Sequence, residues 1–266
     1  MQVYRGLPIL TNQPAGPAHL VGIWGLDHEA SVAEYARLAH AAVDGILERG
    51  RTPLVVGGTG LYFRAALAEL GVPPRPAAGA REHWSRIYDR VGPEAAHAVL
   101  ADRDPVAAAG VHANDRRRVV RALELAEAGS SLRPGRDRLW TPETRCPTLL
   151  VGLEVPREEL SRRIEERTRE MFRRRAAQEA RAALAGGLSS TAAKVIGLQE
   201  AAGLPEEEAI AVVALRTRQY AAYQRKWMRR IPGLVSVRGD RPATETTREI
   251  LDLAGRREPL SARRAD

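Results

Sequence analysis

The stretch Arg51-Thr52-Pro53-Leu54-Val55-Val56-Gly57-Gly58-Thr59-Gly60 decides the predicted fold, because a short apolar run ends there in a glycine-rich turn. Residues 53–56 are typical of a buried strand. An amphipathic helix is predicted directly before them, beginning at Ser31, which forms a capping box with Glu34, and ending at Gly50. Helix, strand and glycine turn in this order predict a parallel α/β sheet.

Further elements are predicted on the C-terminal side of this stretch. Two more strands are expected over residues 148–153 and 234–237, and two long helices over residues 156–184 and 205–229. Residues 63–145 have a mostly helical pattern with Pro and Gly interruptions. The sequence therefore predicts a helical insertion carried by an α/β core.

The predicted domains are a core of residues 1–62 and 146–250, the insertion at 63–145, and a flexible tail at 255–266. The first apparent strand, residues 1–4, has no helix or strand before it, and residues 19–24 are another strand candidate. A doubly wound sheet normally places its first strand centrally. The sequence therefore predicts a sheet whose middle is missing.

Charge and composition limit the class of protein. Lys and Arg number 41 against 33 Asp and Glu; the formal charge of +8 and the isoelectric point near 10.3 suit either a partner of polyanions or an ordinary basic enzyme. Cys146 is the single cysteine, which excludes an intramolecular disulfide and a cysteine-based metal site. No apolar run reaches the length of a membrane span and residues 1–6 lack a signal-peptide pattern, so a soluble, cytoplasmic protein is expected.

Two groups of residues in the first half of the chain are candidates for ligand contact. The turn at residues 57–60 either offers backbone N–H groups and the Thr59 hydroxyl to a ligand, or is simply a tight strand-to-helix turn. Arg117, Arg118 and Arg121 lie on neighbouring positions of a helix that begins at Asn114-Asp115, with no acid in the four residues after Arg117 or Arg118. These arginines either contact nucleic acid, the favoured interpretation, or form a solvated face.

An arginine on an apolar stripe is the next candidate. Leu160, Ile164, Arg167 and Met171 follow one another at spacings of four, three and four, which assigns the Arg167 guanidinium to the buried face of its helix. A buried guanidinium needs an anionic partner. That partner is either a carboxylate such as Glu165, in a structural ion pair, or a substrate diphosphate, which the planar fork of donors suits well.

An aromatic stripe runs along the helix predicted over residues 205–229. Tyr220, Tyr223 and Trp227 share this stripe among six cationic residues between positions 216 and 230. Such interleaving suits the stacking of exposed bases. Packing of the stripe into the core is an equally good interpretation for Trp227.

The same segments resemble the tRNA dimethylallyltransferase family, in the same order from residue 1 to about residue 237. Residues 1–7 are similar to the end of the family's Asp-Ser-Met-Gln-Val-Tyr-Lys/Arg-Gly motif, and residues 51–62 to its internal glycine-rich signature. Residues 114–124 resemble the Asn-Asp segment that contacts tRNA. Arg163-Ile164 with Arg167 and Met171 matches the helix whose arginine serves the prenyl diphosphate, and the closing motif is matched by Thr217-Arg218-Gln219, Gln224 and Trp227.

This resemblance implies a P-loop NTPase-like α/β core, of the kind that binds ATP and other nucleotides, with a helical insertion that binds tRNA. It implies Mg2+, dimethylallyl diphosphate as donor, and N6 of adenosine 37 in the tRNA anticodon loop as acceptor; a monomer is expected. It assigns Thr59 and Arg167 to catalysis and Arg167 and Arg218 to the diphosphate. The residues it implies for tRNA contact are Gln2, Thr59, Arg81, Arg117, Arg118, Arg121 and Lys194.

The sequence departs from the family at its start. The phosphate loop Gly-Pro-Thr-Ala-Ser-Gly-Lys-Ser/Thr, the first strand and the aspartate that serves as general base are absent. Met1 coincides with the methionine inside the first motif, so a start codon assigned too late is the favoured explanation. The chain as written is expected to be inactive.

Two other functions fit parts of the sequence. A non-catalytic tRNA-binding remnant would keep the basic helices and lack the chemistry. An ATP-using small-molecule kinase on a related core is disfavoured by the missing phosphate loop and by the two arginine-rich helices.

Overall fold

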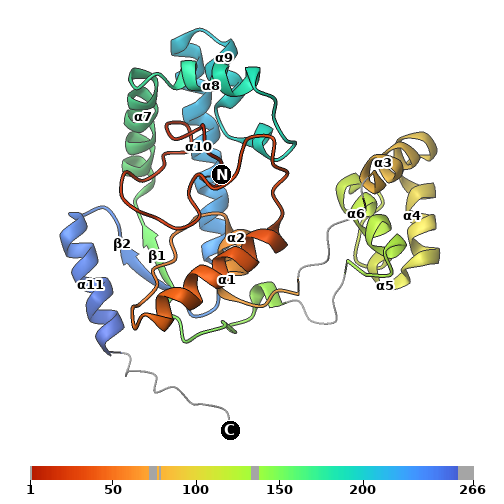
Figure 1. Cartoon of the computed structure of the whole chain (residues 1–266), viewed down its shortest axis with the longest axis horizontal. Helices are drawn as coiled ribbons and strands as arrows, with labels where there is room; N and C mark the ends of the chain where they lie inside the picture. The colour runs from red at the N-terminus through yellow and green to blue at the C-terminus, as the bar shows by residue number, and fades with distance from the viewer. Residues whose placement is uncertain (1, 72–76, 78, 133–137, 257–266) are drawn as a thin grey trace.

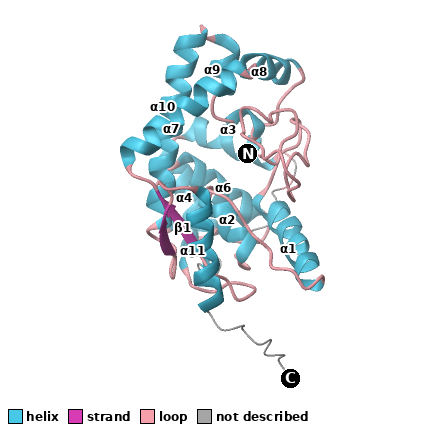
Figure 2. Ribbon diagram, turned by 90° about the vertical axis from the view of Figure 1, so that its left-hand side faces the viewer, coloured by secondary structure: helices cyan, strands magenta, loops and turns pink. Residues whose placement is uncertain are grey.

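The computed structural model describes residues 2–71, 77, 79–132 and 138–256. Helices dominate, and a small parallel sheet accompanies them (Figure 2). Within these ranges, no helix combines the length and the hydropathy of a membrane span. The elements in chain order are α1 (Val32–Glu48), α2 (Gly60–Leu67), α3 (Ala80–Val91), α4 (Pro93–Arg103), α5 (Pro105–Ala108), α6 (Arg116–Glu127), β1 (Val151–Glu154), α7 (Arg157–Arg173), α8 (Ala176–Ala185), α9 (Leu198–Gly203), α10 (Glu206–Met228), β2 (Val235–Arg238) and α11 (Ala243–Arg256).

The sheet consists of β1 and β2, which run parallel with Val151 opposite Val235. The strands predicted at 148–153 and 234–237 are thereby confirmed to within a few residues. The chain between β1 and β2 forms α7 to α10, the helical crossover that a parallel pair requires.

The buried strand predicted at residues 53–56 is wrong. Among the described residues, no strand pairs with this segment, and Leu54 and Val56 are 84% and 83% exposed. Val55 points the other way and packs with Leu67 and Leu150. The apolar run has the pattern of a strand covered on both faces, but here only one face is covered.

The strands predicted at residues 1–4 and 19–24 are reduced to one isolated parallel bridge between Tyr4 and Trp24; Met1 lies outside the described residues. A side chain far along the chain holds the loop that follows Tyr4. The Glu179 carboxylate on α8 accepts hydrogen bonds from the backbone N–H groups of Ile9 and Leu10, at 2.9 and 2.8 Å. A carboxylate thus satisfies backbone donors that have no sheet partner.

Three predicted helices are confirmed, and two of them begin at the predicted caps. The Ser31 hydroxyl accepts from the backbone N–H of Glu34 at 3.1 Å at the start of α1. The Asp115 carboxylate accepts from the N–H of Arg118 at 3.1 Å at the start of α6. The helix predicted at 205–229 is α10. Each cap satisfies a backbone donor that the first helical turn leaves unpaired.

The single long helix predicted over residues 156–184 is wrong, because the chain breaks into α7 and α8. Arg175 between them has φ of +70°, in the left-handed region, and no glycine or proline marks the break. The bend lets α8 pack on α9, and Phe172 and Ala176, on either side of it, both enter the same buried cluster. Burial of apolar side chains on both sides offsets the strain of one left-handed residue.

The helices α3 to α6 pack on one another around their own buried cluster, which includes Trp84, Leu100 and Leu123. Figure 1 shows them standing apart from the other helices and the sheet. A second cluster fills the space between α7, α8, α9 and α10. The predicted tail lies outside the described residues from position 257 onward.

Arg64 on α2 fixes the segment that returns from the insertion. Its side chain is completely buried; Nε donates to the carbonyl of Leu139 at 3.1 Å, and Nη2 donates to those of Thr141 at 2.9 Å and Glu143 at 3.1 Å. One guanidinium therefore satisfies several backbone acceptors of a segment that forms no strand.

Candidate functional site

The glycine turn at residues 57–60 lies directly against α10. A Cβ atom at Gly58 would overlap the side-chain amide of Gln224, and one at Gly60 would overlap the ring of Trp227. Only glycine permits so close an approach. The two glycines therefore bring the turn and the C-terminal half of α10 together, although α10 begins almost 150 residues later in the chain.

Thr59, the predicted catalytic residue, lies between these two glycines and is exposed. Its hydroxyl oxygen is 2.7 Å from the hydroxyl oxygen of Tyr220 on α10. The sequence placed both residues in motifs, and the structure joins them in one hydrogen bond.

The aromatic stripe of α10 is present as predicted. The ring centroids of Tyr220 and Tyr223 are 6.5 Å apart, and those of Tyr223 and Trp227 are 6.2 Å apart. Trp227 also contacts the ring of Trp140 at 4.6 Å, and the guanidinium of Arg230 lies 3.6 Å from the Trp140 centroid. Internal packing therefore accounts for Trp227, whereas Tyr223, 51% exposed, is free to contact a base.

Arg167 is not buried as its stripe predicts. The side chain is exposed on α7, while Ile164 and Met171 beside it are buried. Nearby protein atoms still desolvate the guanidinium enough to lower the pKa of Arg167. Arg218 is half-buried on α10, and α10 packs against α7. No carboxylate in the described ranges pairs with Arg167 or with Arg218. The structural ion pair with Glu165 is excluded, because Glu165 pairs with Arg169.

The predicted tRNA-contacting arginines of the insertion are mostly paired with acids. Arg81 and Arg121 both bind the buried carboxylate of Glu124, at 2.9 and 3.0 Å. This hydrogen bond to Glu124 raises the pKa of Arg81. Arg118 lies 3.7 Å from Asp115, an acid on its N-terminal side. No acid follows Arg117 or Arg118 within four residues, but the fold brings Asp115 to Arg118 from the N-terminal side and Glu124 to Arg121.

Arg117 differs from its neighbours. It is exposed, and among the described residues no acid contacts it. The adjacent Arg116 instead forms a two-bond pair with Asp89, at 2.7 and 2.6 Å. Arg117 is thus the arginine of α6 most available to a phosphate group.

Gln2 and Lys194, the other residues predicted to contact tRNA, lie outside the insertion. The Gln2 amide donates to the carbonyls of Thr11 and Asn12, at 3.1 and 2.6 Å, so it supports the N-terminal loop. Lys194 is exposed at the end of a short 3-10 helix, Ala192–Lys194.

The described residues contain no cluster of acidic, His or Cys side chains that would by itself hold the Mg2+ that the resemblance implies. No group of three or more His, Cys, Asp or Glu side chains converges within these ranges. Mg2+ prefers several oxygen ligands, so no step of a mechanism is assigned to a metal held by these side chains.

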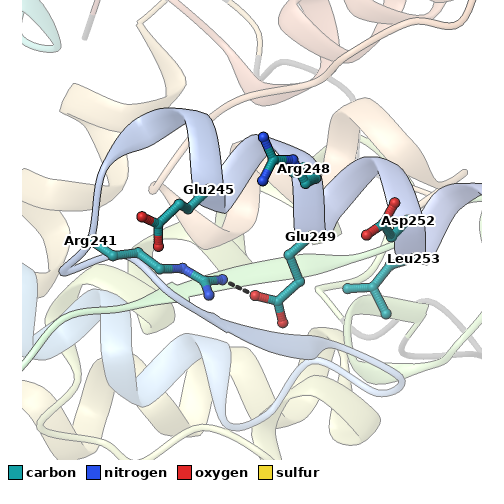
Figure 3. Close-up of a pocket in the computed structure, with 6 residues that line it drawn as sticks. All are labelled: Arg241, Glu245, Arg248, Glu249, Asp252 and Leu253. Carbon is teal, nitrogen blue, oxygen red and sulfur yellow. Dashed lines mark ion pairs between the residues drawn. The ribbon is translucent and has the colours of Figure 1, made fainter.

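A surface hollow of about 560 Å3 lies along α11, and none of the predicted site residues lines it (Figure 3). Arg241 and Glu249 form an ion pair across it, and Glu245, Arg248, Asp252 and Leu253 complete its lining. Three acids and two arginines line the hollow, so it is not selective for an anion.

Two residues of the site were missed by sequence reasoning. Glu124 is the buried partner of two predicted tRNA contacts, and its spacing of three after Arg121 was a usable signal. Trp140 packs on Trp227 from a short 3-10 helix, and no local pattern marks it.

Comparisons with known proteins agree with these motifs. A sequence model of the IPP transferase family matches residues 2–231. The tRNA dimethylallyltransferase of Corynebacterium jeikeium is 38% identical over 255 residues, which cover 91% of this chain and 82% of that protein. The tRNA dimethylallyltransferase of Salinispora arenicola is 39% identical over 245 residues, which cover 87% and 71%.

Solved structures show the same fold. The full-length tRNA isopentenylpyrophosphate transferase of Bacillus halodurans matches with a TM-score of 0.65 and 29% identity, over 96% of this chain and 84% of that one. A eukaryotic dimethylallyltransferase described as acting on tRNA matches with a TM-score of 0.75 over 100% and 74%; at 24% identity this likeness shows the fold alone. The motifs, the family match and the relatives together show that this chain, which is similar in sequence to the tRNA dimethylallyltransferases of Corynebacterium jeikeium and Salinispora arenicola, belongs to the IPP transferase family of enzymes.

Proposed function

We propose that the protein transfers a dimethylallyl group from dimethylallyl diphosphate to N6 of adenosine 37 in tRNA. Family membership over residues 2–231 carries the proposal. It is supported by Arg167 and Arg218, which have no carboxylate partner among the described residues and lie on adjacent helices, and by the exposed hydroxyl of Thr59 beside α10.

In the proposed reaction, the N6 lone pair forms a bond to the allylic carbon while the bond from that carbon to the diphosphate oxygen breaks. N6 then gives its proton to a general base, the role that the resemblance assigns to an aspartate, and the leaving diphosphate takes the electron pair of the broken bond as negative charge. Arg167 and Arg218 stabilise that charge, since a guanidinium fork matches phosphate oxygens and neither arginine is already neutralised within the described ranges.

The acceptor base has to leave the stacked anticodon loop before N6 can react. Thr59 contacts the flipped adenosine, and the exposed ring of Tyr223 offers a face for a neighbouring base. Arg117, Arg118, Arg121 and Arg81 of the insertion, together with Gln2 and Lys194, hold the rest of the loop. We further propose that the protein acts as a monomer.

The test is transfer of label from dimethylallyl diphosphate to an unmodified tRNA with adenosine at positions 36 and 37, with Mg2+ present. The 266-residue chain is assayed beside the protein expressed from its complete reading frame, so that any residues encoded before Met1 are included. Digestion to nucleosides should release N6-dimethylallyladenosine. A tRNA with guanosine at position 37 is the matched control and should stay unlabelled.

The competing function, a tRNA-binding protein without chemistry, gives a different result. Both forms would bind the tRNA with a salt-dependent affinity, and neither would incorporate label. Label on another nucleotide would contradict adenosine 37 as the acceptor but would still support dimethylallyl diphosphate as the donor.

A further inference from the structure

The hydrogen bond between Thr59 and Tyr220 sits at the centre of a three-point contact. Gly58, Thr59 and Gly60 meet Gln224, Tyr220 and Trp227 respectively, which lie along one side of α10 at spacings of three and four residues. Because the two glycine contacts fix the backbone on both sides of Thr59, the position of its side chain relative to α10 is also fixed. The 2.7 Å separation between the two hydroxyl oxygens is therefore a consequence of the packing.

Chemistry indicates which hydroxyl donates. A phenol, with a pKa of about 10, is a much stronger acid and a weaker acceptor than an aliphatic alcohol. Tyr220 is thus the better donor and Thr59 the better acceptor. The hydrogen of the Thr59 hydroxyl then remains available on the exposed side of the turn, where residues 57–59 are open to solvent.

We propose that Tyr220 is a positioning residue for the transfer reaction: by donating its hydroxyl hydrogen to Thr59, it directs the Thr59 hydroxyl hydrogen toward an acceptor atom of the bound adenine. This inference rests on the proposed function and adds a residue to it. Tyr220 itself does not contact the substrate; it acts through Thr59.

The first test is Tyr220→Phe in the protein expressed from its complete reading frame. This change removes one oxygen and keeps the ring that packs against Tyr223. We expect kcat to fall by about tenfold, the size of effect that one lost hydrogen bond gives. The melting temperature and the Kd for tRNA should stay those of the parent. Tyr35→Phe on α1 is the matched control, since it removes the same oxygen from a tyrosine outside the proposed site and should leave kcat unchanged.

A double-mutant cycle separates positioning from a general effect on the site. In a Thr59→Ala background, Tyr220→Phe should have no further effect on kcat. In a Thr59→Ser background its effect should exceed that in the parent, because serine lacks the β-branch that restricts the hydroxyl rotamer. Equal effects of Tyr220→Phe in the parent and in the Thr59→Ala background would overturn the inference, as would an unchanged kcat in the parent.

A second measurement uses binding alone and so separates this inference from the proposed function. tRNA carrying 2-aminopurine at position 37 reports the surroundings of that base by its fluorescence when bound. Tyr220→Phe and Thr59→Ala should shift the emission of the complex alike, and Tyr35→Phe should not. If the parent transfers no prenyl group, the proposed function fails while this result still decides whether Tyr220 orients Thr59; identical emission from all four proteins would overturn the role.

Discussion

The arginines of α6 and those of the α7–α10 pair look alike in sequence but differ in their surroundings. On α6, Arg118 pairs with Asp115, and Arg121 shares the buried Glu124 carboxylate with Arg81. On α7 and α10, Arg167 and Arg218 pair with no acid of the described residues. A cluster of cations in a sequence therefore does not by itself identify a phosphate site; the acids that the fold brings to it decide how much charge is left for a ligand.

Among the changes that test this difference between the arginines, Glu124→Gln is expected to have the largest effect, which is a loss of stability. The change leaves two guanidinium groups around a neutral amide, so α3 to α6 should be destabilised by about 1–3 kcal/mol, a range that allows for the solvent exposure of Arg81. Chemical denaturation followed by far-UV circular dichroism measures the loss. The control is Glu94→Gln on α4, because the Glu94 carboxylate has no ion-pair partner in the described ranges. Equal stability of both variants would show that the pairing is incidental.

A smaller effect is expected for tRNA contact by α6. Because Arg121 shares the buried Glu124 carboxylate and Arg118 pairs with Asp115, Arg117 is the best candidate; Arg117→Ala should lower the tRNA affinity and reduce the salt slope by about 0.7 to 0.9, and Arg118→Ala should reduce it by less. Arg116→Ala, which breaks the pair with Asp89, should change the slope less. Filter-binding titrations at several salt concentrations test this order, and an equal slope for all three variants would refute it.

The smallest effect concerns the paired arginines of α7. Hydrogen bonds from Arg162 and then Arg163 lower the pKa of Glu159 to about 2 from its ordinary value of 4.5. Because the pKa is lower in the folded protein, the ionised Glu159 carboxylate stabilises the fold above pH 4.5, and this stabilisation is lost as the pH falls toward about 2. The difference in melting temperature between the parent and Glu159→Gln should be small at neutral pH, because the pair is exposed. This difference should disappear as the pH falls from 4.5 toward about 2. A gap that widens on acidification would contradict the pairing.

Local patterns predicted the elements whose determinants are local. The cap of α1 at Ser31, the cap of α6 at Asp115 and the apolar periodicity of α10 all lie within a few residues of the elements they define. The same holds for the glycine turn, although its docking on Gln224 and Trp227 required the fold.

The failed predictions all depend on distant partners. The apolar run at residues 53–56 has the composition of a doubly covered strand, but burial depends on neighbouring strands, and none in the described ranges pairs with it. The break at Arg175 follows from the packing of α8 on α9. Periodicity gave the angular position of Arg167 on α7 but not whether another element covers it.

The central claim is that Arg167 and Arg218, which pair with no acid in the part of the chain that the structure describes, hold the diphosphate donor. The most direct test is the kinetics of Arg167→Ala beside Arg162→Ala. Both changes remove an arginine from α7, but Arg162 is already paired with Glu159 and Glu166. In the protein expressed from its complete reading frame, Arg167→Ala should lower kcat/KM for dimethylallyl diphosphate by about 100-fold, with the Kd for tRNA unchanged, while Arg162→Ala keeps both. An unchanged kcat/KM in Arg167→Ala, or an equal loss in both variants, would contradict the claim.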